Sequence, residues 1–102
     1  MRGEVWLVRL DPTFGSEMKK TRPCVVISPN EMVLRTVIIA PLTSRGFQAP
    51  SRVATSFGNV PGFIALDQIR TVDKARLIRN MGTLPIDELK TTLETLSEMF
   101  AL

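Results

Sequence analysis

The chain has 102 residues, of which 44% are hydrophobic and 23% charged, with a formal net charge of +3; we expect a single domain over residues 1–102. It has no His, no Tyr and one Cys, which excludes the usual Ser-His-Asp and Cys-His arrangements and the common zinc sites, and we expect neither metal nor cofactor. The longest apolar runs are too short to span a bilayer and residues 1–4 lack a signal-peptide pattern, so with its lone Cys the sequence predicts a soluble, cytoplasmic protein.

Six short segments rich in β-branched and apolar residues predict strands, and Pro and Gly residues mark the junctions between them. The second segment is apolar on both faces, which is typical of a central strand. In chain order the predicted strands are Glu4–Leu10, Cys24–Ser28, Thr36–Leu42, Arg52–Thr55, Phe63–Val72 and Arg76–Met81, with a turn at residues 73–75.

A helix is predicted to begin at Pro85, because Pro suits the first helical position and Asp87 and Glu88 complement the helix dipole. Apolar residues then recur at three- and four-residue steps along one face: Ile86, Leu89, Leu93, Leu96 and Phe100. Strands followed by one helix indicate a mainly β fold, a small, strongly bent antiparallel sheet or barrel capped by that helix.

The polar segment of residues 11–23 joins the first two predicted strands and concentrates hydroxyl and carboxylate groups, two ammonium groups and a guanidinium. Loops held between strands are where binding and catalytic groups gather, and Pro23 biases Arg22 toward an extended conformation. Such a basic loop suggests an anionic substrate, with phosphate the obvious candidate.

Charge is distributed unevenly along the chain. Residues 1–84 hold twelve Lys and Arg against six Asp and Glu, whereas residues 85–102 hold one Lys against four acids. A basic body favours nucleic acid or an acidic protein as partner, and a merely basic surface is the alternative.

Four motifs together resemble the MazF/PemK toxins over essentially the whole chain. They are Gly3–Val8 with Asp11–Glu17 and Lys20–Pro23, then Ala40–Ser44, Leu66–Asp73 and Gly82–Pro85. The resemblance implies a small SH3-like antiparallel barrel of the MazF/CcdB type and a homodimer. It also implies a metal-independent, sequence-specific endoribonuclease that cuts single-stranded RNA by 2′-hydroxyl attack, leaving 2′,3′-cyclic phosphate and 5′-hydroxyl ends, and that a cognate acidic antitoxin neutralises.

Three residues are the predicted catalytic groups. Arg22 matches the Arg of the family's Arg-Pro motif, and a guanidinium can stabilise the charge that develops on phosphate; pairing with an acid is the alternative. Thr43 matches the family's second catalytic position and can hydrogen-bond a phosphate or the 2′-hydroxyl, unless it only bonds its own backbone. Glu17 can accept the 2′-hydroxyl proton or instead pin the loop through an ion pair.

Further residues are predicted to contact RNA. Lys19 and Lys20 supply charge along the backbone, Phe14 and Phe47 are candidates to stack on bases, and Gln68 and Arg70 to reach base edges; Ser16 and Ser44 complete the set. The alternatives are a hydrophobic plug for each Phe, and an ion-pair network with Asp67 or Asp73 for Gln68 and Arg70. Trp6 and Cys24 are expected in the core.

Two rival functions remain open at this point. One is a non-enzymatic poison resembling the CcdB gyrase toxins, acting through the apolar C-terminal residues 99–102. The other is a nucleic-acid-binding module that uses the same basic face without catalysis.

Overall fold

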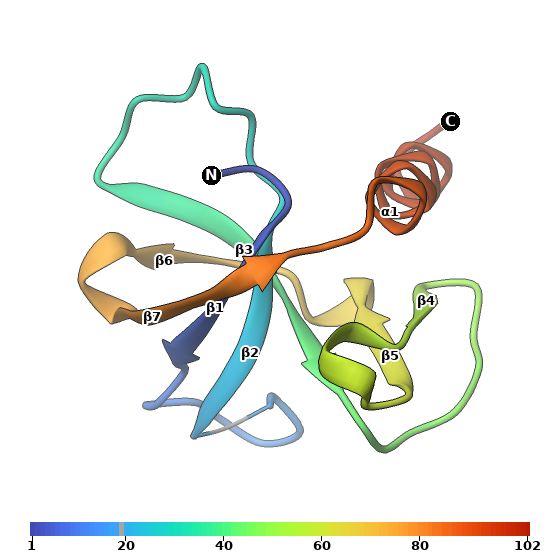
Figure 1. Ribbon diagram of the computed structural model, residues 1–102, viewed down its shortest axis with the longest axis horizontal. Coiled ribbons are helices and arrows are strands. Elements are labelled where there is room, and N and C mark those ends of the chain that lie inside the picture. Colours follow the sequence, from blue (N-terminus) through green and yellow to red (C-terminus); the bar gives the residue numbers. More distant parts are fainter. Residues whose placement is uncertain (19) are drawn as a thin grey trace.

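The computed structural model describes residues 1–18 and 20–102, and Figure 1 shows its strands curving around one another with the helix to one side. The strands are β1 (Glu4–Arg9), β2 (Thr21–Val26), β3 (Thr36–Thr43), β4 (Arg52–Thr55), β5 (Gly62–Ala65), β6 (Arg70–Asp73) and β7 (Leu77–Thr83). Three short 3-10 turns, η1 (Phe57–Asn59), η2 (Leu66–Gln68) and η3 (Lys74–Arg76), precede the helix α1 (Ile86–Met99).

The strands form one antiparallel sheet in the order β4-β5-β3-β2-β1-β7, with β6 pairing to β3 outside this path. One edge of the long strand β3 serves two partners, because its first half pairs with β6 and Leu42–Thr43 pair with β5. The pairing of β1 with β7 shifts register twice, and such irregularities increase bending. The expected class, mainly antiparallel β with a C-terminal helix, is confirmed.

The core lies on both sides of the sheet. Val25, Ala40 and Ile64 belong to a cluster between the sheet and α1, and Cys24 and Val26 to a second cluster on the opposite side. Alternate residues of β2 therefore enter different clusters, which confirms the central strand predicted from its two apolar faces. Trp6 is only partly buried against the second cluster, whereas Cys24 is fully buried as expected.

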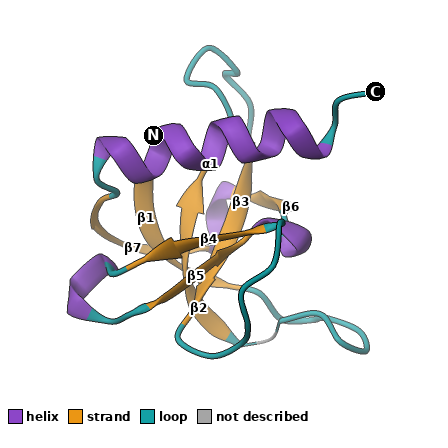
Figure 2. Cartoon of the chain, turned by 90° about the vertical axis from the view of Figure 1, so that its right-hand side faces the viewer, coloured by secondary structure: helices purple, strands orange, loops and turns teal. Residues whose placement is uncertain are grey.

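Figure 2 shows α1 lying across the sheet, at a steep angle to β1 and β3, and it contacts β4 in particular. The predicted apolar stripe is correct in its middle, where Leu89 and Leu96 pack on the first cluster. It is wrong at its ends, since Ile86 and Phe100 are 66% and 71% exposed. Thr92 is fully buried instead, and its hydroxyl donates to the Glu88 carbonyl inside the helix, which satisfies the polar atom.

The single strand predicted over residues 63–72 is wrong. The turn η2 divides it into β5 and β6, which then pair with different halves of β3. Ile64, Ala65 and Leu66 are all buried, so the apolar run continues into the first residue of the turn, and only Asp67 and Gln68 mark the break with polar side chains. Within the described residues, no helix is long and apolar enough to cross a membrane.

Candidate functional site

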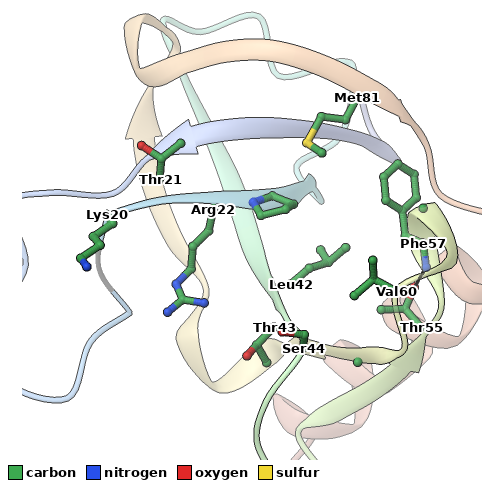
Figure 3. A pocket seen from close by; sticks show the side chains of 13 residues that line it. Lys20, Thr21, Arg22, Leu42, Thr43, Ser44, Thr55, Phe57, Val60 and Met81 are labelled. Carbon is green, nitrogen blue, oxygen red and sulfur yellow. Dashed lines mark hydrogen bonds between the residues drawn. The ribbon is translucent and has the colours of Figure 1, made fainter.

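A cleft of about 490 Å³ opens where β2 begins and β3 ends. Cys24 pairs with Pro41 and Val25 with Ala40, and continuing this antiparallel register sets Arg22 opposite Thr43. Figure 3 shows the Arg22 guanidinium pointing toward the end of β3, where Thr43 and Ser44 lie. The register of two neighbouring strands therefore unites two predicted groups that are far apart in sequence.

The cleft has two chemically different ends. Lys20, Arg22, Thr43 and Ser44 line the polar end. Leu42, Phe57, Val60 and Met81 line the other end, which is apolar and is built from β3, β7, η1 and the loop after η1. Phe57, Val60, Met81 and Thr55 were not predicted as site residues, because they lie outside the four motifs and only the fold brings their segments together.

The Thr43 hydroxyl is hydrogen-bonded to the local backbone, at Arg45, which is the alternative to a catalytic role that the sequence left open. It donates to the Arg45 carbonyl at 3.0 Å and accepts from the Arg45 amide at 3.1 Å, which closes the turn after β3. A hydroxyl has one proton and two lone pairs, so one lone pair stays available. In this arrangement Thr43 can accept a further hydrogen bond, which suits orienting a hydroxyl donor of a substrate.

A second hollow of about 350 Å³ holds most of the other predicted contact residues. Phe14, Ser16, Glu17, Gln68 and Arg70 all line it, together with Pro41, which precedes Leu42 and Thr43 of the first cleft on β3. The predicted catalytic group Glu17 thus lies here and not beside Arg22 and Thr43.

The side chains of this hollow also hold the loop between β1 and β2. Glu17 accepts a hydrogen bond from the Phe14 amide at 2.6 Å, and the Gln68 side-chain oxygen accepts one from the Met18 amide at 3.4 Å. Arg70 donates to the Leu10 carbonyl at 3.0 Å. Glu17, Gln68 and Arg70 therefore have structural roles, whatever they bind.

Two predicted aromatic contacts are open to solvent, since Phe14 is 83% and Phe47 68% exposed. That exposure excludes the alternative of buried hydrophobic plugs. Phe47 lies over the Arg52 guanidinium, 5.3 Å from ring centroid to the guanidinium carbon. Lys20 is exposed at the entrance to the cleft, and Lys19 lies outside the described residues.

Two ionisable groups near the site have displaced pKa values. Burial raises the pKa of the Cys24 thiol to about 12, despite the opposing charges of Arg22 and Arg70. Burial also acts to raise the pKa of Asp67, but hydrogen bonds from Arg52, its own backbone and Gln68, with the Arg52 charge, lower it overall. Cys24 therefore stays protonated and unreactive near neutral pH, and Asp67 stays a carboxylate.

Among the described residues, no three Cys, Asp or Glu side chains come together as a set of metal ligands. The ion-pair network considered for Gln68 and Arg70 takes a different form. Asp67 pairs with Arg52, and Asp73 accepts a hydrogen bond from the Ala75 amide.

The chain matches the family model described as PemK-like, MazF-like toxin of type II toxin-antitoxin system over residues 1–100. It is 38% identical to the endoribonuclease PemK of Escherichia coli over 104 residues, which cover 94% of this chain and 78% of that protein. It is 34% identical to the endoribonuclease MazF9 of Mycobacterium tuberculosis over 107 residues, covering 93% and 91%. The crystal structure of MazF from Deinococcus radiodurans shares the fold, with a TM-score of 0.84, 25% identity and coverage of 99% and 96%. The chain therefore belongs to the PemK-like, MazF-like family of toxins of type II toxin–antitoxin systems.

Proposed function

We propose that this protein is a sequence-specific toxin endoribonuclease that cleaves single-stranded RNA without a metal ion. The observation that carries the proposal is the pairing of Arg22 with Thr43 and Ser44 at the polar end of one cleft. The curated relatives named endoribonucleases support the same reaction class. The exposed Lys20 at the entrance adds the positive charge that an RNA backbone requires.

In the proposed reaction, the ribose 2′-oxygen attacks the adjacent phosphorus as the bond to the 5′-oxygen breaks. This route needs no nucleophile from the protein, and it leaves a 2′,3′-cyclic phosphate and, once the departing 5′-oxygen takes a proton from Arg22 or water, a 5′-hydroxyl. Arg22 stabilises the negative charge that builds on the phosphate oxygens, because a planar guanidinium can donate to two of them at once. Thr43 orients the 2′-hydroxyl through the lone pair that the Arg45 backbone leaves unused.

Glu17 remains the proposed acceptor of the 2′-hydroxyl proton. Because it lines the second hollow while Thr43 lines the first cleft, the loop that carries Glu17 would have to move for its carboxylate to reach the 2′-hydroxyl that Thr43 orients. Phe14, Ser16, Gln68 and Arg70 would then hold neighbouring nucleotides, with Ser44 and Phe47 acting from the loop after β3. Glu17→Gln tests the assignment, since a general base is lost in this variant while its oxygen can still accept from Phe14.

The proposed partners are a second copy of the chain and an acidic antitoxin. The edge strand β7 exposes Ile78 and Met81, which supports a dimer interface along this edge. The family's membership of toxin–antitoxin systems supports the antitoxin, and a basic cleft suits an acidic partner electrostatically.

The decisive experiment incubates purified, antitoxin-free protein with a long RNA of mixed sequence in excess EDTA. We expect cleavage at one short sequence with 2′,3′-cyclic phosphate ends, and a loss of kcat of roughly 10²–10³-fold in Arg22→Lys, which keeps the charge but not the paired donors. Arg35→Gln is the matched control, because Arg35 precedes β3 at the end opposite Thr43 and is exposed.

Absence of cleavage by the folded wild-type protein would overturn the proposal. The gyrase-poison alternative then regains its place, since Met99, Phe100 and Leu102 are exposed at the C-terminal end. Deleting residues 100–102 distinguishes the two: toxicity should survive this deletion in a ribonuclease and disappear in a poison that binds through this end.

A further inference from the structure

The two loops that border the candidate site are joined by a chain of side-chain contacts. Its centre is Arg52, on the first position of β4, whose side chain is only 10% exposed. The guanidinium makes two parallel hydrogen bonds to Asp67, with Nε 3.0 Å from Oδ1 and Nη2 3.1 Å from Oδ2. Such a paired geometry fixes both groups in orientation as well as in distance.

Arg52 also touches the loop between β3 and β4, which carries Ser44. The Phe47 ring covers its guanidinium, with 5.3 Å between the centroid and the central carbon. Gly46 allows this approach, because a Cβ there would come within 2.8 Å of Nη1, and its φ of +113° is itself unfavourable for other residues. The backbone of this loop therefore packs closely against the Arg52 guanidinium at Gly46.

From Asp67 the contacts continue to the other loop. Gln68 directly follows Asp67 in the turn η2, and its side-chain oxygen accepts from the Met18 amide at 3.4 Å. Because Asp67 and Gln68 are neighbours in one tight turn, a shift of the Asp67 carboxylate is expected to displace Gln68 as well. The bond to Met18 is long, so a small displacement of Gln68 is enough to break it.

We propose that Arg52 is a positioning residue that couples the β3–β4 loop to the β1–β2 loop through Asp67 and Gln68, and thereby sets which RNA sequence is cut. The second clause rests on the proposed function. Arg52 lines neither of the two hollows, so it acts on substrate only through the loops. Coupling holds Phe14, Ser16 and Glu17 at a fixed position relative to Ser44 and Phe47, so that neighbouring nucleotides are read as one unit.

The first arm of the test needs no RNA. Amide exchange with water at Met18 is measured by NMR on isotope-labelled protein for the wild type, Arg52→Gln, Asp67→Asn and the double variant. We expect roughly three- to tenfold faster exchange in each single variant, as loss of one hydrogen bond predicts. The double variant should be no faster than either single one, because one chain of contacts is broken in all three. Arg35→Gln, which removes the same charge at the far end of β3, should match the wild type.

The coupling would be overturned if the Met18 amide exchanged at the wild-type rate in both single variants. It would also be overturned if the effects of the two substitutions on this rate added up in the double variant. The second arm compares cleavage of a mixed-sequence RNA. We expect Arg52→Gln to lower kcat/KM at the preferred sequence by up to about a hundredfold and to weaken discrimination against other sequences, because the loops that carry Phe14 and Phe47 lose their fixed separation.

If Met18 exchanged faster but the preferred RNA sequence did not change, the loops would be coupled without setting sequence specificity. If the wild type cleaves no RNA, the proposed function fails, and the exchange measurement still decides the coupling. The two failures are therefore distinguishable.

Discussion

The Cys24 thiol lies in the second core cluster, where burial raises its pKa from 9.0 to about 12. The folded protein therefore keeps a proton that the unfolded chain releases above pH 9. Stability that depends on this group is complete below pH 9 and is lost as pH rises toward 12. We expect the free energy of unfolding to fall across this range with a slope from Cys24 approaching about 1.4 kcal/mol per pH unit.

Urea unfolding of wild type and Cys24→Ala at several alkaline pH values measures that slope. Other groups such as Lys titrate in the same range, so the prediction concerns the difference between the two proteins, which should shrink as pH rises. Equal slopes in both proteins would contradict the raised pKa.

Arg22 and Thr43 show what the sequence can predict of a site. Their identity followed from motifs, but their proximity follows from the register that pairs Cys24 with Pro41, which no local pattern specifies. The predicted partnership with Glu17 did not emerge, because its carboxylate closes the turn at Phe14 in the second hollow. The pairing of strands fixes the relative positions of their side chains. The position of a loop residue such as Glu17 depends instead on individual hydrogen bonds, which no sequence pattern predicts.

Elements were predicted well where one physical signal dominated. The helix α1 was found from its apolar period and acidic first turn, and β2 from its two apolar faces. The η2 turn was missed because Leu66 is buried like its strand neighbours, so burial and local conformation conflict there. That turn also presents Asp67 and Gln68 to the loops, so the missed element is the one that organises the surroundings of the site.

The contact between α1 and β4 allows a prediction about how the helix is held. The Thr55 hydroxyl lies 2.5 Å from the Glu88 carboxylate and also accepts from the Phe57 amide, while Thr55 is buried. Thr55→Val removes both bonds and leaves their partners unsatisfied. We expect the free energy of unfolding to fall by about 1–3 kcal/mol, measured by urea denaturation.

The control for this prediction is Thr91→Val on the same helix. The Thr91 hydroxyl donates only to the Asp87 carbonyl one turn earlier, on an exposed surface. Its replacement should change stability by no more than about 0.5 kcal/mol. Equal losses in the two variants would show that the Thr55–Glu88 contact contributes nothing particular to docking of α1.

Across the whole molecule, residues 85–102 are net acidic and form the helix and tail, while twelve of the thirteen Lys and Arg lie in residues 1–84, which form the sheet and its loops. This division was visible in the sequence as a difference in charge. What it did not reveal is that two hollows border the end of β3, one lined by Thr43 and Lys20 and the other by Pro41. The fold brings a few of the basic residues, such as Arg22 and Lys20, together at one cleft.

Electrostatic binding at that site predicts a specific dependence on salt. Each phosphate neutralised on a single strand adds about −0.7 to the slope of log K against log salt concentration. Lys20→Gln should therefore make the slope shallower by roughly 0.7, measured by fluorescence anisotropy with a 2′-O-methyl RNA that cannot be cleaved. Arg35→Gln, with the same loss of charge at the opposite end of β3, should leave the slope nearly unchanged. If the slope changed equally in both variants, RNA binding would depend on net charge alone, and the proposal that the RNA backbone binds at the cleft would be wrong.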